Sequence, residues 1–265
     1  MKTLIIVPTY NERENISALL EAILKLQQGH NILVVDDNSP DGTGEIVRQW
    51  SQKNPQVHLL SRPGKQGLGR AYIAGFKWGL ENGYEALIEM DADFSHRPED
   101  LQPLISKLKD HDFAVGSRYI EGGRTVNWGI LRKIISRGGG IYSRLILGFP
   151  LNDWTGGFNA WKKHVLEGIQ LDSVKSNGYS FQIELKYKAL KKGFRGAESP
   201  IVFEDRRVGQ SKMSFKIVIE AFYRVWLLRA KYNIESYFRN CSWLFFYQRT
   251  SLGASNSTCE KSSKS

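Results

Sequence analysis

Two carboxylates separated by one residue give the sharpest chemical signal in this sequence. Asp91 and Asp93 follow the apolar run 86–88, and side chains at positions i and i+2 of an extended segment point to the same side. Such a pair can bind one divalent cation, most simply Mg²⁺ or Mn²⁺, together with oxygens of a substrate phosphate. Glu89 adds negative charge two residues earlier. Most Asp-x-Asp pairs are solvated acidic turns, but the exit from a buried strand favours a metal site here.

A second acidic pair, Asp36 and Asp37, follows the apolar run 31–35. These carboxylates could accept hydrogen bonds from a base or ribose, or one of them could be a turn residue before Asp41; the residues alone leave both open. The segment Gly67-Leu68-Gly69 could suggest a dinucleotide fold. That fingerprint belongs after the first strand and needs a third glycine, so the pattern argues against a dehydrogenase.

The elements that must position these groups alternate between short apolar runs and helical periodicity. Strands are predicted at 3–7, 31–35, 57–60, 86–90 and 113–115, and helices near 16–24, 43–52, 68–81 and 98–108, the first capped by Asn11 or Asn15. This alternation predicts an α/β fold with a mostly parallel central sheet and helices on both faces. Ligands bind outside the carboxyl ends of such strands, where the polar segments fall.

Beyond Gly116 the alternation of strands and helices is less regular, and glycine clusters separate short segments. A helix is predicted near 181–191, a strand at 200–203 and a helix at 214–232. A single domain is expected to span about residues 1–230. The Ser-, Thr-, Asn- and Lys-rich segment 241–265 is predicted to be a disordered tail. Cys241 and Cys259 show no metal-binding spacing, and no apolar run reaches the roughly 20 residues of a spanning helix, which favours a cytosolic or peripheral protein.

Charge is distributed unevenly along the chain. Residues 1–100 carry 10 Lys and Arg against 14 Asp and Glu, a net charge of −4, and the remainder carries 27 against 13, a net charge of +14. Nucleic acid, an anionic membrane surface or a phosphorylated substrate could each supply the counter-charge. Nucleic-acid binding would need aromatics interleaved with basic residues or a recognition helix, and neither is clear.

Several ordered motifs over about residues 1–230 resemble those of family 2 glycosyltransferases, and more narrowly of polyprenyl-phosphate (dolichyl-phosphate) mannosyltransferases. The motifs are 8–12, 36–42, 67–69, 91–96, 116–119, Trp128-Gly129 with Arg132, 153–158, 178–182 with Glu184, and 203–206 with Gly209, Ser211 and Lys212. The resemblance implies a GT-A fold that transfers mannose from GDP-mannose to the phosphate of a long isoprenoid, with inversion to a β-linked product.

The resemblance also implies roles for residues at matching positions. Nucleotide contacts fall on Pro8, Tyr10, Glu12, Asp37 and Asp41; metal and diphosphate contacts on Asp91 and Asp93; and phosphate contacts on Arg118, Arg132, Arg206 and Lys212. Asp91, Asp93 and Arg118 are the expected catalytic residues, with Mg²⁺ or Mn²⁺ as cofactor. One position departs from the family, which often has a basic residue where this chain has Asn159.

The chemistry of this reaction agrees with the residues present. A sugar nucleotide leaves as a diphosphate, and a divalent ion and nearby cations stabilise the charge that develops. The phosphomonoester acceptor is already an anion near neutral pH, so no strong general base is needed. Consistently, no compelling histidine–carboxylate dyad is evident, and His96 is expected to support the loop rather than act as a base.

Two other functions and two further segments of the chain are also considered. The same fold and acceptor could use UDP-glucose or another sugar nucleotide, and a basic nucleic-acid-binding protein is a remote alternative. The segment 205–212 is expected to close over bound donor and acceptor. The helix within 213–232 is expected to lie at the cytoplasmic face of a membrane, because its apolar face is edged by cations and the acceptor's isoprenoid must stay in a bilayer.

Overall fold

The computed structural model describes residues 1–176, 178–204 and 223–232. Residues 1–225 form one compact unit, and residues 226–265 form a second, of which the described part, 226–232, is helical. Arg206, Lys212 and the expected closing segment 205–212 lie outside the described residues. So do the first part of the expected interfacial helix, up to residue 222, and the tail 241–265.

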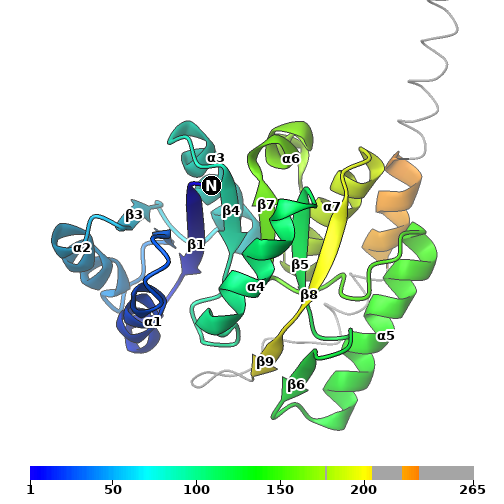
Figure 1. Ribbon diagram of the computed structural model, residues 1–265, viewed down its shortest axis with the longest axis horizontal. Helices are drawn as coiled ribbons and strands as arrows, with labels where there is room; N and C mark the ends of the chain where they lie inside the picture. Colours follow the sequence, from blue (N-terminus) through cyan, green and yellow to red (C-terminus); the bar gives the residue numbers. More distant parts are fainter. Residues whose placement is uncertain (177, 205–222, 233–265) are drawn as a thin grey trace, which may run out of the picture. The chain divides into compact units, whose positions relative to one another are not determined.

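A seven-stranded sheet forms the centre of the first unit, in the order β3-β2-β1-β4-β7-β5-β8 (Figure 1). The strands are β1 (Thr3–Thr9), β2 (Asn31–Asp36), β3 (Val57–Ser61), β4 (Ala86–Glu89), β5 (Phe113–Ser117), β7 (Asn159–Lys162) and β8 (Gly196–Pro200). The pairings are parallel except for those of β7, which runs antiparallel between β4 and β5. A separate parallel pair joins β6 (Arg124–Val126) to β9 (Val202–Glu204).

Helices cover both faces of this sheet, as the alternating pattern predicts (Figure 1). They are α1 (Arg13–Lys25), α2 (Thr43–Lys53), α3 (Leu68–Glu81), α4 (Leu101–Ser106), α5 (Ile130–Leu147), α6 (Lys163–Gly168) and α7 (Gly178–Lys191). Short 3₁₀ turns lie at Pro98–Asp100, Lys107–Lys109 and Leu171–Ser173. None of the described helices combines the length and apolarity needed to cross a membrane.

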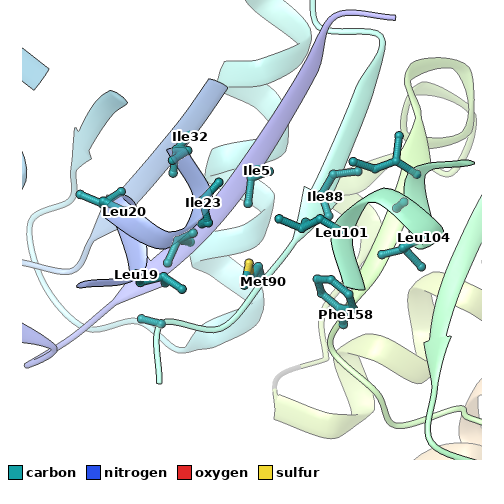
Figure 2. Close-up of a cluster of buried hydrophobic side chains, with 14 of the residues drawn as sticks. Ile5, Leu19, Leu20, Ile23, Ile32, Ile88, Met90, Leu101, Leu104 and Phe158 are labelled. Atoms are coloured by element: carbon teal, nitrogen blue, oxygen red, sulfur yellow. The ribbon is translucent and has the colours of Figure 1, made fainter. Parts of the chain in front are cut away.

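The two faces of the sheet follow from the alternation of side chains along each strand. Ile5 of β1 belongs to a core shared with α1, in which Leu19 and Ile23 are buried, and the same core extends to α4 (Figure 2). On the opposite face, α3 approaches so closely that a Cβ on Gly75 would lie 2.5 Å from Ile6. Glycine here lets the helix pack directly on the strand.

The predicted cap of the first helix was wrong. The residue before α1 is Glu12, and no side chain caps the helix there. Asn11 takes a left-handed conformation (φ 61°) in the preceding turn, and Asn15 is already inside the helix. The Glu12 carbonyl accepts the N–H groups of Asn15 and Ile16 instead, so the turn is closed by backbone.

The second half of the chain differs more from the predictions. The 18-residue helix α5 was missed because glycines 138–140 suggested a break, and β6, β7 and α6 were missed as well. The predicted single strand 200–203 was wrong: it is divided at Ile201, so that β8 ends in the main sheet and β9 begins in the small one. Of the predicted helix 214–232, residues 223–232 are described and are helical.

Candidate active site

The candidate site lies along the edge where the parallel strands end. β2, β1 and β4 are neighbours, so the segments 36–41, 8–12 and 91–96 emerge side by side. β7 runs in the opposite direction and therefore begins at this edge, with Asn159 paired in register to Glu89 and to Val115. The antiparallel strand thus brings the loop 152–158 to the same edge as the acidic pair.

At the end of β2, the two carboxylates have different surroundings. Asp36 is buried and accepts hydrogen bonds from the Thr9 hydroxyl (2.9 Å) and from the Ser39 amide (3.0 Å) and hydroxyl (2.6 Å). Asp37 pairs with Arg62, whose Nη1 lies 2.7 Å from the carboxylate. Burial raises the pKa of Asp37 in spite of the opposing charge of Arg62. Asp36 therefore supports the turn, and Asp37 is the expected nucleotide contact.

The remaining expected nucleotide contacts lie around the start of α1 and α2. Asp41 accepts hydrogen bonds from the Thr43 amide (3.0 Å) and hydroxyl (2.6 Å) and from the Arg13 amide (3.1 Å). Burial alone would raise the pKa of Asp41, but these hydrogen bonds outweigh it and lower the pKa. The backbone amide of Glu12 donates to the Thr43 hydroxyl (3.0 Å), so the two helix starts are joined.

Tyr10 and Pro8 complete this side of the edge. The ammonium of Lys65 lies 4.2 Å from the centre of the Tyr10 ring. Pro8 belongs to β1 itself and is paired with Val35. The structure therefore gathers all five expected nucleotide residues at neighbouring strand ends, and their contact with a nucleotide stays a prediction.

The acidic pair follows β4 after Met90, and Asp93 lies in a turn rather than in the extended segment that was expected. Asp91 accepts a hydrogen bond from the Tyr72 hydroxyl (3.2 Å), and Asp93 accepts one from the Ser95 amide (3.1 Å). Within the described residues, no three or more His, Cys, Asp or Glu side chains cluster closely enough to hold a metal ion. Two carboxylates fit a Mg²⁺ or Mn²⁺ ion that takes its other ligands from water and substrate phosphates.

Glu89, the third acidic residue here, does not join the pair. Its side chain is fully buried and accepts hydrogen bonds from the Trp161 indole (2.6 Å) and from Gln182. Burial raises its pKa to about 7, although these donors oppose the shift. The expected extra charge beside Asp91 is therefore turned into the interior.

His96 holds the turn of the acidic pair rather than acting as a base. Its Nδ1 accepts the backbone N–H of Asp91 (3.1 Å), and its ring packs on Phe158 and Phe203, with ring centres 4.9 Å and 5.3 Å away. Burial lowers its pKa to about 4, so the imidazole is neutral near pH 7. Because Nδ1 accepts, the proton of the neutral ring is on Nε2, so neither nitrogen has a lone pair available for a proton from an acceptor.

Arg118 is held by the loop 152–158. Its Nε and Nη2 each lie 2.7 Å from the Asp153 carboxylate, and Nη2 also donates to the Thr155 hydroxyl (2.8 Å). Both charged residues are buried. Burial alone would raise the pKa of Asp153, but the ion pair outweighs it and lowers the pKa to about 2. The structure therefore fixes the guanidinium, and its contact with a phosphate stays a prediction.

An aromatic group connects Arg118 with Arg132. The guanidinium carbon of Arg132 lies 4.1 Å from the centre of the Trp128 ring, and that of Arg118 lies 5.5 Å from the same ring. The Phe203 ring meets Trp128 edge to face, 5.3 Å away. Because α5 starts just after Trp128, the site continues onto this helix.

Sequence reasoning found Arg118 but missed the residues that fix it. Asp153 lay in a noted motif without an assigned role, and Lys186 and Glu198 carried no local signal. Asn159 is fully buried and donates to Gln182 (2.8 Å) and to the Gly156 carbonyl (3.2 Å). Asn159 thus belongs to an interior amide network.

A comparison with known protein families identifies the family of this chain. The family described as Glycosyl transferase family 2 matches residues 4–169. The chain belongs to this family. It is a glycosyltransferase, and the expected fold and resemblance are confirmed.

Two bacterial relatives of this glycosyltransferase cover most of both chains. The undecaprenyl-phosphate mannosyltransferase of Micrococcus luteus is 45% identical over 235 residues, 88% of this chain and 97% of that protein. The polyprenol monophosphomannose synthase of Mycolicibacterium smegmatis is 45% identical over 234 residues, 87% of this chain and 88% of that protein.

Among solved structures, the glycosyltransferase shares its fold with glucosyl-3-phosphoglycerate synthase of Mycobacterium tuberculosis. The complex of that enzyme with Mn²⁺, UDP and phosphoglyceric acid aligns over 87% of this chain and 78% of the other, with a TM-score of 0.62 and 16% identity. At this identity the likeness supports the fold alone.

Proposed function

We propose that this glycosyltransferase transfers mannose from GDP-mannose to the phosphate of a polyprenol, with inversion at the sugar carbon. The observation that carries the proposal is that one sheet edge combines the acidic pair Asp91 and Asp93 with the fixed cation Arg118. The names of the two relatives, a polyprenol monophosphomannose synthase and an undecaprenyl-phosphate mannosyltransferase, support the acceptor and the sugar.

The acidic residues would bind the metal ion and the basic residues would bind phosphates. Asp91 and Asp93 would hold Mg²⁺ or Mn²⁺, which neutralises charge on the departing diphosphate when it is bound. Arg118 and Arg132 would bind phosphate oxygens, and Arg206 and Lys212 are proposed for the same role. Cations are needed because the reaction brings an anionic acceptor to an anionic donor. Arginine suits this task because its guanidinium has five N–H donors. Arg118 uses Nε and Nη2 on Asp153 and Thr155, so it would reach a phosphate through its remaining N–H groups.

The acceptor needs little activation by the protein. A phosphomonoester is ionised near neutral pH, and the neutral, hydrogen-bonded His96 is consistent with a site that moves no proton from the acceptor. Burial of Arg118 beside aromatic rings excludes water from one side of the site. Exclusion of water protects a reactive glycosyl donor from hydrolysis.

A direct assay tests both the donor and the acceptor. Purified protein is incubated with radiolabelled GDP-mannose, Mg²⁺ or Mn²⁺ and a polyprenyl phosphate, and parallel reactions contain UDP-glucose. We expect label in the lipid fraction from GDP-mannose only, and only with the divalent ion. Transfer from UDP-glucose would favour the alternative donor, and full activity in excess chelator would contradict the metal site.

The surface of helix α5 supports a function at a membrane. From the sequence, contact with the membrane was expected for the helix within residues 213–232. Its buried positions are mostly small, including Ser136, Gly140 and Ser143, whereas its large apolar side chains face outward. The exposed apolar residues of α5 are Ile130, Leu131, Ile134, Ile141 and Leu145, with exposed fractions from 54% to 79%. This arrangement reverses that of a helix that only packs on a protein core.

The charges of α5 indicate that its exposed apolar side would contact an anionic bilayer. Residues 130–147 contain Arg132, Lys133, Arg137 and Arg144 and no acidic residue. Cations beside an exposed apolar stripe are typical of helices that lie in the headgroup region. Because Arg132 contacts Trp128 at the site, this face would bring the bilayer to the position where the acceptor phosphate must arrive.

Vesicle flotation tests the α5 surface. We expect the chain to bind vesicles containing anionic lipid, and Lys133→Glu with Arg137→Glu to weaken binding by about fivefold per basic side chain lost. Leu131→Ser with Leu145→Ser should also weaken it, without lowering the melting temperature. The matched control is Lys107→Glu with Lys109→Glu on the 3₁₀ turn beside α4. Equal loss in the control pair would indicate a general charge effect and contradict a specific surface.

A further inference from the structure

A buried lysine lies beneath the loop that holds Arg118. Lys186 on α7 is fully buried, and its ammonium donates to the backbone carbonyls of Asp153 (3.2 Å), Trp154 (3.2 Å) and Gly156 (2.8 Å). An ammonium has three N–H donors, so the loop uses all of them. Burial of an ammonium carries a large desolvation cost, and a purely structural position could be filled by an apolar side chain.

The loop 152–158 is fixed from a second side by Glu198 on β8. This carboxylate accepts the backbone N–H groups of Asn152 (3.1 Å) and Asp153 (3.0 Å). A cation therefore binds the carbonyls of the loop, and an anion binds its amides. The Asp153 carboxylate is turned the other way, toward Arg118 and the Gly156 amide (2.9 Å).

We propose that Lys186 is a positioning residue for glycosyl transfer: its ammonium holds the loop 152–158 in the one conformation in which Asp153 clamps Arg118. The inference rests on the proposed role of Arg118 beside the phosphates. Lys186 touches neither substrate nor metal in this scheme. It acts through two successive contacts, first with the carbonyls of the loop and then through the Asp153 carboxylate.

The surroundings of Lys186 explain why a positive charge is needed there. Glu89 and Asp153 are both fully buried nearby, and Arg118 is committed to Asp153. Asn159 shares the Gly156 carbonyl with Lys186 and lies 3.4 Å from Glu89, but an amide carries no charge. Lys186 thus supplies the cation of this interior cluster from α7.

A neighbouring lysine on the same helix gives a matched control. Lys188 is also buried, but its ammonium donates to the Gln170 carbonyl (3.4 Å) and to the Ser173 hydroxyl, away from the loop 152–158. Lys186→Met and Lys188→Met remove the same charge from buried positions two residues apart. A general effect of losing a buried lysine should appear in both variants.

The first readout is steady-state kinetics at a temperature where the variants are folded. Displacement of a catalytic group by about 1 Å can cost about 10²-fold in rate, so kcat of Lys186→Met should fall by about 10- to 100-fold. The KM for GDP-mannose should change by less than about threefold, since the expected nucleotide contacts lie at other strand ends. Lys188→Met should retain kcat.

The second readout does not depend on activity. Solvent exchange of the Arg118 Nε–H, followed by NMR with labelled arginine, should become about tenfold faster in Lys186→Met, because the clamp of Asp153 loosens. The same group should be unchanged in Lys188→Met. If the wild-type chain failed to transfer mannose, this measurement would still test the role of Lys186, so the two proposals can fail separately.

Relocation of the charge gives the most specific test. In the double variant Lys186→Met with Asn159→Lys, a lysine at position 159 starts beside the same Gly156 carbonyl and the same Glu89. We expect kcat of this double variant to be at least about tenfold higher than that of Lys186→Met. The Arg118 Nε–H should also exchange more slowly than in Lys186→Met. An unchanged kcat and exchange rate in Lys186→Met would overturn the proposal, as would equal losses in Lys188→Met.

If Lys186→Met does not fold, the wild-type chain itself decides the question. Burial lowers the pKa of Lys186 to about 8; Asp153, Glu89 and Glu198 oppose this shift and Arg118 adds to it. Exchange of the Arg118 Nε–H, measured relative to Arg62, should therefore rise by about tenfold from about pH 7 to about pH 9.5 as the ammonium loses its proton. The ¹³C shift of the Lys186 Cε, followed in the same samples, locates the titration of the ammonium, and a constant exchange ratio through that titration would refute the proposal.

Discussion

The two halves of the active-site edge hold their charged groups by different means. In the loops after β1, β2 and β4, some carboxylates bind groups within their own turns, as Asp41 binds Thr43 and Asp93 binds Ser95, each two residues away. Their longer-range partners lie at neighbouring strand ends, as Thr9 does for Asp36. Around β5 and β7 the partners are distant: Arg118 binds Asp153, 35 residues away, and Gln182 of α7 binds Glu89, which is 93 residues away and turns inward from the end of β4. Local turns therefore contribute to the first half, whereas the second is held mainly by residues distant in the sequence.

This difference has a consequence for substitutions. A residue held by a local turn can change its chemistry while the turn survives, so its replacement should affect ligand binding more than stability. A residue held by distant partners in the interior is part of the packing, so its replacement should affect both. Each prediction below tests one side of this contrast.

The largest effect on activity is expected for Asp93→Asn, in the locally built half. The amide keeps an oxygen for the Ser95 amide but loses the charge that would bind the divalent ion. We expect kcat/KM to fall by about 10³-fold, while the melting temperature changes by no more than about 4 °C. Mannose transfer and thermal unfolding, measured on one preparation, check this. Near-normal transfer would remove Asp93 from the metal site.

The largest effect on stability is expected for Asp153→Asn, in the half held by distant partners. The substitution leaves the Arg118 guanidinium buried without its counter-charge, and loss of one partner of a buried pair costs about 3–5 kcal/mol. Urea unfolding near pH 7 measures this, and transfer activity should fall in parallel. A variant with unchanged stability but lost activity would place Asp153 among the ligand-binding residues instead.

The same pair predicts how stability depends on pH. The pKa of Asp153 is lowered to about 2 in the folded chain, against about 3.9 for an unfolded aspartate. The pair therefore contributes its full stability above the unfolded value, and this contribution is lost as pH falls through about 2. The difference in unfolding free energy between wild type and Asp153→Asn should narrow between about pH 4 and pH 2. A constant difference would contradict the lowered pKa.

The contrast also explains what the sequence could predict. Period-two and helical apolar patterns, which are local, predicted every strand from β1 to β5 and the helices between them, and α3 was predicted with its observed ends. The strand ends then indicated Asp37, Asp91 and Asp93 because polar residues follow apolar runs directly. The antiparallel β7 and the network around Lys186 have no local pattern, since their partners come from β4, β5, β8 and the loop 152–158.

Helix α5 shows the same limit for a different reason. A core helix is recognised by an apolar stripe that faces inward, but in α5 the inward positions are small and glycines 138–140 resemble a break. Gly140 is required by packing, because a Cβ there would lie 2.9 Å from the Asn152 carbonyl oxygen. The outward apolar side chains then suit a partner that the sequence pattern alone does not show.

A moderate effect on donor binding is expected for Asp37→Asn. The carboxylate is paired with Arg62 but belongs to a strand end expected to contact the nucleotide. We expect KM for GDP-mannose to rise by about tenfold, the equivalent of one charged hydrogen bond, with kcat changed less than about threefold. Arg62→Met is the control: similar effects in both variants would mean that the ion pair, rather than Asp37 alone, orders the nucleotide side.

The smallest effect is expected for Asp41→Ala, which removes two contacts with Thr43 in the same turn and one with the Arg13 amide, 28 residues away. The Thr43 and Arg13 amides lose their acceptor, and an intramolecular hydrogen bond typically contributes about 1 kcal/mol to stability. For the unit of residues 1–225 this lowers the melting temperature by about 2–4 °C. Asp41→Ser separates the turn from the ligand, because a serine hydroxyl can still accept a backbone N–H. We expect Asp41→Ser to restore stability while KM for GDP-mannose stays raised, because the acidic group itself is the proposed ligand contact. That result would indicate that Asp41 contacts the nucleotide directly. Recovery of both in the serine variant would show that Asp41 acts only through the turn.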